Sequence, residues 1–372
     1  MNGYPVFRRA DERPSIAAPP SPVFDRAVAP YGGTLDMAAI PCPERGGINE
    51  IVSVFRGTID SLSHNDVPLS ICDNTEVGVI DNVDFNAVAL QKEGVNCIGI
   101  YLGLILGVYR LFMGLFASPR FMPNIGCPSE EDLPDRSLGL LLAGDIADEW
   151  RAPNDFVRLD AARNFAFNAC MYVFLHELTH VARGHLDLLK TAHGVTEHLE
   201  YSSCPLPQDR AFLMRVLELD ADGFASLHSM AKWHYAVTSG MFPAIGGLRP
   251  EWTWATGVNV FFRLLDRRSL QLPDLASRTH PGPGVRWVGA VLNLLGEWPA
   301  PSGFLKDDFS ELTIAADREV RTLWRELAVP HPAFESLYRS MEDSQNELLS
   351  YVQELRALDS TLTDMARRTR MA

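Results

Sequence analysis

The sequence predicts an α+β fold that is mostly helical, with a small β-sheet next to a histidine-rich helix. Over most of the 372-residue chain after residue 102, apolar residues recur at helical spacing. Residues 67–101 instead contain short β-branched runs separated by turn residues, which is typical of strands. The stretch FLHELTHVARGH, residues 174–185, lies inside a strong helical pattern at 155–190. Three histidines and one glutamate therefore lie on a helix that is otherwise mostly apolar.

The chain divides into three parts. Residues 1–47 are rich in Pro, Gly and Ala and carry no sustained period, so we expect extended or mobile chain there. Residues 48–300 begin with a helix, whose apolar positions between 48 and 62 fall on one face, and we expect them to form the domain that carries the chemistry. Residues 301–372 are expected to form a helical C-terminal region.

The strand pattern is clearest at 85–90 and 95–101, on either side of a turn at Gly94. It predicts a hairpin or two neighbouring strands. Residues 97–117 are also nearly long and apolar enough to span a bilayer. Arg110 interrupts them, and a charged residue at the centre of a span costs about 2.5–3.5 kcal/mol on insertion scales. We therefore favour a buried strand followed by a core helix, with a membrane span as the alternative.

Helical periodicity predicts further helices at about 208–236, 251–267, 284–297, 309–327 and 333–371. In the last of these, apolar residues recur every seven positions, at Met341, Leu348, Leu355 and Leu362. This recurrence is typical of a long helix packed on its own domain and also of a coiled-coil helix. We favour the packed helix and keep binding of a partner or of a second copy through 333–371 as the alternative.

Composition excludes some classes of partner and favours one compartment. The formal net charge is −14 and no run of Lys and Arg compensates it, which argues against nucleic acid or an anionic membrane as the main partner. The six cysteines include no C-x-x-C pair, and the first residues contain no apolar signal-peptide core. We therefore expect a cytoplasmic protein with reduced thiols.

The spacing of the first two histidines in 174–185 predicts a zinc site. His176 and His180 are four residues apart, so on a helix both imidazoles can point to one position. Glu177 directly follows the first of them, which places its carboxylate beside the metal rather than on it. There it can take a proton from metal-bound water. The run therefore supplies two ligands and a general base.

A hydrolytic zinc site needs a third protein ligand. One candidate is His185. The extended pattern H-E-x-x-H-x-x-G-x-x-H requires glycine at 183 and histidine at 186, and Arg183 and Leu186 occupy these positions. We therefore expect His185 to lie just past a helix bend at Gly184, and a direct metal role for it is the less favoured alternative.

The second candidate is Glu218, in the run RVLELDADGFA at 215–225. Glu218 and Asp222 are four residues apart and share a helix face, and small residues beside them leave room for a neighbouring helix. Glu218 would bind zinc, and Asp222 would hold a ligand histidine through its other ring nitrogen. A solvated acidic face is the alternative, which the upstream H-E-x-x-H disfavours.

Three short motifs together resemble those of the M48-type zinc peptidases, which belong to the glutamate-zincin group. They are H-E-L-T-H at 176–180, E-L-D-A-D at 218–222 and H-P-x-x-x-x-R at 280–286. The likeness covers about residues 160–290, and the first hundred residues match nothing in that family. The order of strand, turn, strand and helix before H-E-x-x-H is also similar to that of soluble bacterial phage-exclusion peptidases.

The resemblance implies a zincin-like core and a role for each motif residue. Zn²⁺ would be bound by His176, His180 and Glu218, with Glu177 as the general base and Asp222 holding a ligand histidine. His280 would lie near the substrate and assist the reaction.

These observations predict a soluble zinc-dependent endopeptidase that hydrolyses peptide bonds by glutamate-assisted attack of zinc-bound water. The oxyanion needs a donor besides the metal, and the candidates are His280 and, if it is turned inward, Arg286. Strands at 85–101 could offer an edge to an extended peptide or protein substrate. The alternatives are a zinc hydrolase acting on a non-peptide amide, and a non-catalytic interaction protein that uses the C-terminal helix.

Overall fold

The structure is a computed structural model, and its described part forms the predicted α+β, mostly helical fold with one small sheet. It describes residues 20–40, 42–64, 74–142, 151–194, 197–199, 208–240, 247–269, 280–281, 283–297, 306–327, 353–354 and 357–358.

The sheet has four strands in the order β1-β3-β2-β4. They are β1 Thr75–Ile80, β2 Ala87–Lys92, β3 Val95–Tyr101 and β4 Glu197–Leu199. β2 and β3 form the predicted hairpin, which turns at Glu93 and Gly94, and β1 runs parallel to β3. Because β2 also pairs with β4, both hairpin strands are internal. The expectation that 85–101 offers a free edge to a peptide is therefore wrong, and within the described chain β1 and β4 are the outer strands.

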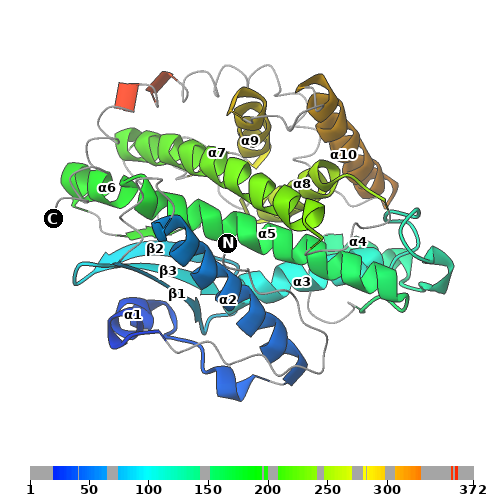
Figure 1. The fold of residues 1–372 in the computed structure, drawn as a ribbon, viewed down its shortest axis with the longest axis horizontal. Coiled ribbons are helices and arrows are strands. Elements are labelled where there is room, and N and C mark those ends of the chain that lie inside the picture. The colour runs from blue at the N-terminus through cyan, green and yellow to red at the C-terminus, as the bar shows by residue number, and fades with distance from the viewer. Residues whose placement is uncertain are drawn as a thin grey trace.

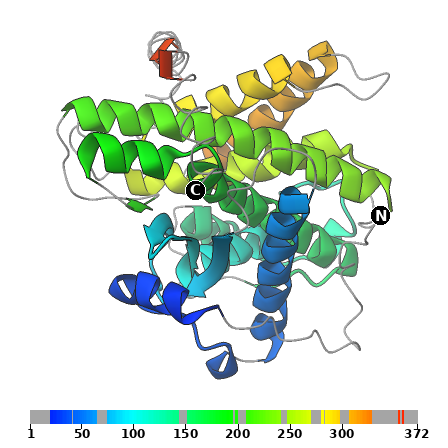
Figure 2. The same ribbon diagram turned by 60° about the vertical axis from the view of Figure 1, so that its left-hand side comes forward.

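The helices surround one long central helix, α5. Their bounds are α1 Pro22–Val28, α2 Cys42–His64, α3 Leu102–Phe116, α4 Asp135–Leu142, α5 Phe156–Ala182, α6 His185–His193, α7 Gln208–Thr238, α8 Pro250–Ser269, α9 Pro283–Glu297 and α10 Lys306–Glu326. The sheet, α1 and α2 lie on one side of α5, and α7, α9 and α10 lie on the other (Figures 1 and 2). The helices predicted between 48 and 327 are confirmed.

The N-terminal part differs from the expected extended chain. Ser21 caps α1 by accepting hydrogen bonds from the backbone of Val23 and Phe24, at 3.2 and 3.4 Å. Phe24 and Val28 then pack on one face of the sheet, where they are fully buried. The high Pro and Ala content of 1–47 therefore concealed a short helix that covers the sheet, while residues 1–19 lie outside the described chain.

The apolar stretch 97–117 contains a strand followed by a buried helix, as favoured from the sequence. β3 leads directly into α3, which packs against α5 through Phe112 and Phe165, whose ring centroids are 5.7 Å apart. Among the described residues, no helix combines the length and apolar content needed to cross a bilayer.

The beginning of α5 is anchored by a buried arginine. Arg158 is fully buried and donates hydrogen bonds to the carbonyl oxygens of five residues at 2.7–3.1 Å, namely Phe116, Ser118, Phe121, Met122 and Ile125. Burial lowers the pKa of Arg158, and the nearby Glu131 carboxylate opposes that shift. One side chain therefore ties the loop after α3 to the helix that carries His176 and His180.

Most of the C-terminal helix predicted at 333–371 lies outside the described residues. The described pairs 353–354 and 357–358 are helical. Leu358 packs against apolar residues of α6 and α7, including Leu189 and Leu217. Leu358 therefore lies against the body of the protein, and binding of a partner through 333–371 stays a prediction.

Candidate metal centre

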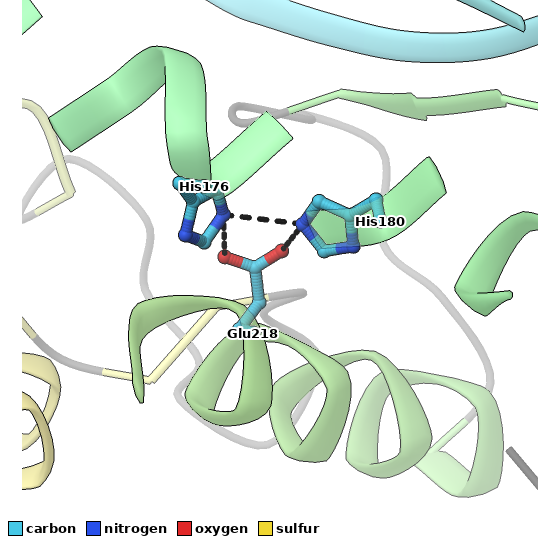
Figure 3. A group of neighbouring side chains, drawn as sticks. All are labelled: His176, His180 and Glu218. Carbon is cyan, nitrogen blue, oxygen red and sulfur yellow. Dashed lines mark hydrogen bonds and ion pairs between the residues drawn. The ribbon is translucent and has the colours of Figure 1, made fainter. Parts of the chain in front are cut away.

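The predicted zinc ligands come together between α5 and α7. His176 and His180 lie one turn apart on α5 and both face Glu218 on α7 (Figure 3). The two Nε2 atoms are 3.1 Å apart. The Glu218 carboxylate completes a triangle, with Oε2 3.2 Å from His176 Nε2 and Oε1 3.4 Å from His180 Nε2. Three donor atoms therefore surround one point.

The size of this triangle fits a metal ion of the zinc type. Ligand atoms about 2.0–2.1 Å from a tetrahedral zinc lie about 3.3 Å from one another. All three residues are at most 1% exposed, and a buried carboxylate is costly unless a cation or a set of donors compensates it. Two imidazole nitrogens and a carboxylate form a set that zinc commonly uses. The group His176, His180 and Glu218 could therefore hold a metal ion.

Asp222 takes the position predicted for it. Its Oδ1 lies 2.9 Å from His176 Nδ1. A carboxylate there accepts the Nδ1 proton, which leaves the lone pair of His176 Nε2 directed at the centre. Tyr172 also donates a hydrogen bond to Asp222 Oδ1, at 3.0 Å. Burial, together with the charge of Asp222, raises the pKa of Tyr172, so this phenol remains a donor.

Arg286 is turned inward, but towards Asp222. It donates two hydrogen bonds to that carboxylate, from Nε at 2.7 Å and from Nη2 at 2.8 Å. Nη2 also lies 3.4 Å from Glu218 Oε2, and the side chain is 2% exposed. This bidentate pair assigns Arg286 to holding Asp222, so the predicted contact with substrate or oxyanion is not what the geometry favours.

The approach of α9 to α7 depends on a glycine. A Cβ atom on Gly223 would overlap the side-chain amide of Asn293 on α9. Asn293 follows Arg286 by seven residues and therefore lies on the same face of α9. Gly223 thus leaves room for the helix that brings Arg286 to Asp222.

The third predicted motif also reaches the site. His280 precedes α9, and its Nε2 lies 3.2 Å from Glu218 Oε2. Its side chain is 13% exposed, so it lies nearer the solvent than the three ligands do. The motif of His280 was the least specific of the three in the sequence. Its proximity to the centre agrees with the prediction.

Glu177 lies beside the ligands and outside the ligand triangle. It is the next residue after His176 on α5 and is 1% exposed. Glu177 is therefore a buried carboxylate next in the chain to a residue that could bind a metal ion, and its role as a general base stays a prediction.

A second network begins at the predicted bend after His180. Gly184 has a left-handed backbone, with φ of 76°, and separates α5 from α6. His185 follows it, with Nδ1 3.0 Å from His180 Nδ1 and Nε2 2.9 Å from Asp220 Oδ2. Arg183 also donates two hydrogen bonds to Asp220, at 2.9 and 3.2 Å. His185 therefore lies behind a ligand rather than in the ligand triangle.

The charge of Asp220 is favoured by this network. Burial acts to raise the pKa of Asp220, but the hydrogen bond and charge of His185 and the interactions with Arg183 outweigh it, and the net shift is downward. Sequence reasoning missed Asp220 and Arg183, because each appeared as one charge among several on a helix. The run ELDAD offered a weak signal. On a helix Asp220 lies two residues from both Glu218 and Asp222, so its carboxylate faces away from theirs.

Comparison of the chain with protein-family models, curated proteins and solved structures finds no match. The likeness to M48-type peptidases therefore depends on the motifs and on the way in which their residues meet.

Proposed function

We propose that this protein is a zinc-dependent endopeptidase with a site of the M48 type on a zincin-like core. The single observation that carries the proposal is the meeting of two distant motifs, one on each of two helices. His176 and His180 face Glu218, and one turn beyond Glu218 the carboxylate of Asp222 holds His176 by its other nitrogen. A structural zinc site needs no buried carboxylate beside its ligands, whereas Glu177 is suited to proton transfer.

Zinc bound by His176, His180 and Glu218 would act as a Lewis acid and lower the pKa of a water molecule towards about 7. Glu177 is the residue of this chain that takes the proton of the attacking water and delivers it to the leaving amine.

His280 is the candidate donor to the developing oxyanion. It lies on the Glu218 side of the triangle, and it is the most exposed of the site histidines. Arg286 contributes by a different route, since its guanidinium fixes Asp222 and thereby the ring of His176. One motif therefore supplies both a residue that meets the substrate and a residue that positions a ligand.

The substrate class can be tested in cells. New protein N-termini are to be compared between cells expressing the native chain and cells expressing Glu177→Gln, at equal protein levels. Cleavage of peptide bonds predicts N-termini that appear with the native chain alone. Identical sets in both would contradict an endopeptidase and would favour hydrolysis of a non-peptide amide or a purely interacting protein.

A further inference from the structure

The two histidines of the site are held by different partners. His176 Nδ1 faces the carboxylate of Asp222 directly, at 2.9 Å. His180 Nδ1 instead faces the Nδ1 atom of His185, at 3.0 Å, and the other nitrogen of His185 faces Asp220 Oδ2, at 2.9 Å. His180 is therefore connected to a carboxylate through a second imidazole.

Asp220, at the end of this series of contacts, determines which nitrogen atoms of His185 and His180 carry a proton. Asp220 pairs with Arg183 through both carboxylate oxygens, so it is a charged acceptor. His185 Nε2 must then carry a proton, and a neutral His185 has only a lone pair at Nδ1. Between two Nδ1 atoms one must donate, and this leaves His180 to donate. Its Nε2 atom is thereby left without a proton, facing His176 and Glu218.

We propose that His185 is a positioning residue of the metal centre, which with Asp220 and Arg183 sets the tautomer and orientation of His180 for metal binding. The inference rests on the proposed function, since it needs a metal at His176, His180 and Glu218. His185 does this without touching the metal.

The backbone and the burial of His185 support this role. Gly184 follows α5 in a left-handed conformation and changes the direction of the chain. This brings the ring of His185 against the ring of His180, five residues earlier in the sequence. His185 is fully buried, so water does not compete for its nitrogens, whereas Asp220 and Arg183 extend to the partly exposed rim. A partly buried arginine thus acts on a buried ligand through two intervening side chains.

Two substitutions at His185 separate the contacts that it makes. Asn places its amide oxygen where the Nδ1 atom of histidine lies, so His185→Asn keeps an acceptor for His180. Gln places its amide nitrogen where Nε2 lies, so His185→Gln keeps the donor to Asp220 and removes the acceptor. His193→Gln, at the end of the same helix and away from the site, is the matched control.

Zinc affinity of the full chain is measured by competition with a chelator, and the absorption spectrum of the Co²⁺-loaded protein reports ligand geometry. We expect His185→Gln to weaken zinc binding about 10- to 100-fold, as loss of a partner behind a ligand histidine does. It should also change the Co²⁺ spectrum. His185→Asn should stay within about threefold of the native affinity, and His193→Gln should be unchanged.

Native affinity and spectrum in His185→Gln would overturn the inference, as would equal losses in the Asn and Gln variants. A lower melting temperature of metal-free His185→Gln with unchanged zinc affinity would show a merely structural role and would overturn it too. A native chain that binds no zinc would contradict the proposed function itself, so the two failures are distinguishable.

Discussion

Glu218 is the residue at which the separate elements of the site meet. Its carboxylate lies within 3.2–3.4 Å of His176 and His180 from α5, of His280 from the segment before α9, and of Arg286 from α9 itself. A carboxylate that is fully buried among three imidazoles and a guanidinium is placed to share a cation with the two helical histidines. Removing it should therefore affect both metal binding and the joining of α5 to α7.

The first prediction is that Glu218→Ala releases the metal and lowers the melting temperature of zinc-loaded protein. Metal that binds only the folded chain adds its binding free energy to stability, and that contribution is lost with the ligand. Zinc content by mass spectrometry and thermal unfolding check this, with the exposed Glu311→Ala on α10 as the control. Full zinc content in Glu218→Ala would show that the ligand assignment is wrong.

His280 is predicted to act in the transition state. A hydrogen bond to the oxyanion strengthens only as charge develops there, so His280→Ala should lower turnover about 100-fold. The Michaelis constant and the zinc content should change little. Steady-state kinetics on a peptide substrate decide the matter; a raised Michaelis constant with unchanged turnover would indicate simple binding instead.

Site residues that are linked by their spacing in the sequence were predictable. Partners that meet only through tertiary contacts were not. His176, Glu177 and His180 follow from helical geometry, and the meeting of Glu218 and Asp222 with them agrees with the motif order. The partners of Arg286 and His185 depend on how α9 and α6 approach α7. No local pattern encodes those approaches, so Arg286 was predicted only as a possible contact of substrate or oxyanion, and Asp220 only as part of a solvated acidic face.

At the scale of elements, α5 depends on the anchorage of its first turn. Arg158 donates to the carbonyl oxygens of five residues in the segment 116–125, and buried carbonyl groups need such donors. The Glu131 carboxylate accepts hydrogen bonds from the backbone of Asn154 and Asp155, at 3.0 Å each, just before the helix. The helix that carries His176 and His180 is thus tied to the loop after α3.

We predict that Arg158→Leu destabilises the fold by about 3–5 kcal/mol, because it leaves buried carbonyl groups without this donor and removes the cation beside the Glu131 charge. Denaturant unfolding measures the change. Arg151→Leu, which removes an exposed arginine shortly before the same helix, should change stability by less than about 0.5 kcal/mol. Equal stabilities of the two variants would contradict the anchoring role.

Long, periodic elements were predicted well from the sequence, and short ones were not. The hairpin of β2 and β3 and the long helices α5 and α7 carry enough apolar positions to define a period. α1, α4 and β4 have seven, eight and three residues, too few for a period to stand out. Their formation depends on packing. In α1, for example, Phe24 packs on the sheet.

At the scale of the whole molecule, the stability of the folded protein should differ between acid and neutral pH because of Glu50 on α2. Burial raises the pKa of Glu50 to about 7, and the charge of Arg163 opposes the shift. Between the unfolded pKa of about 4.5 and this value the folded state binds more protons than the unfolded state. Stability therefore falls as pH rises through that window.

We predict that Glu50→Gln, relative to the native chain, gains about 1 kcal/mol at pH 8 and little at pH 5. This figure is discounted for the solvent exposure of the side chain. Unfolding free energies from denaturant titrations at both pH values test it, with Glu311→Gln as an exposed control. The same difference at pH 5 and pH 8 would mean that Glu50 does not titrate in this window.

Molecular partners and location remain predictions at this scale. The net charge of −14 predicts that nucleic acid is not the main partner. The contact of Leu358 with α6 and α7 agrees with a C-terminal helix that packs on its own domain.

The central claim, that α5 and α7 build a hydrolytic zinc centre, is tested most directly by peptide cleavage with purified protein. The native chain and Glu177→Gln, each loaded with zinc to the same content, are incubated with a mixed peptide library, and the products are identified by mass spectrometry. The account predicts cleavage by the native chain and a loss of at least about 100-fold in Glu177→Gln, because the base is not a ligand. Equal cleavage by both proteins, or none by the zinc-loaded native chain, would contradict it.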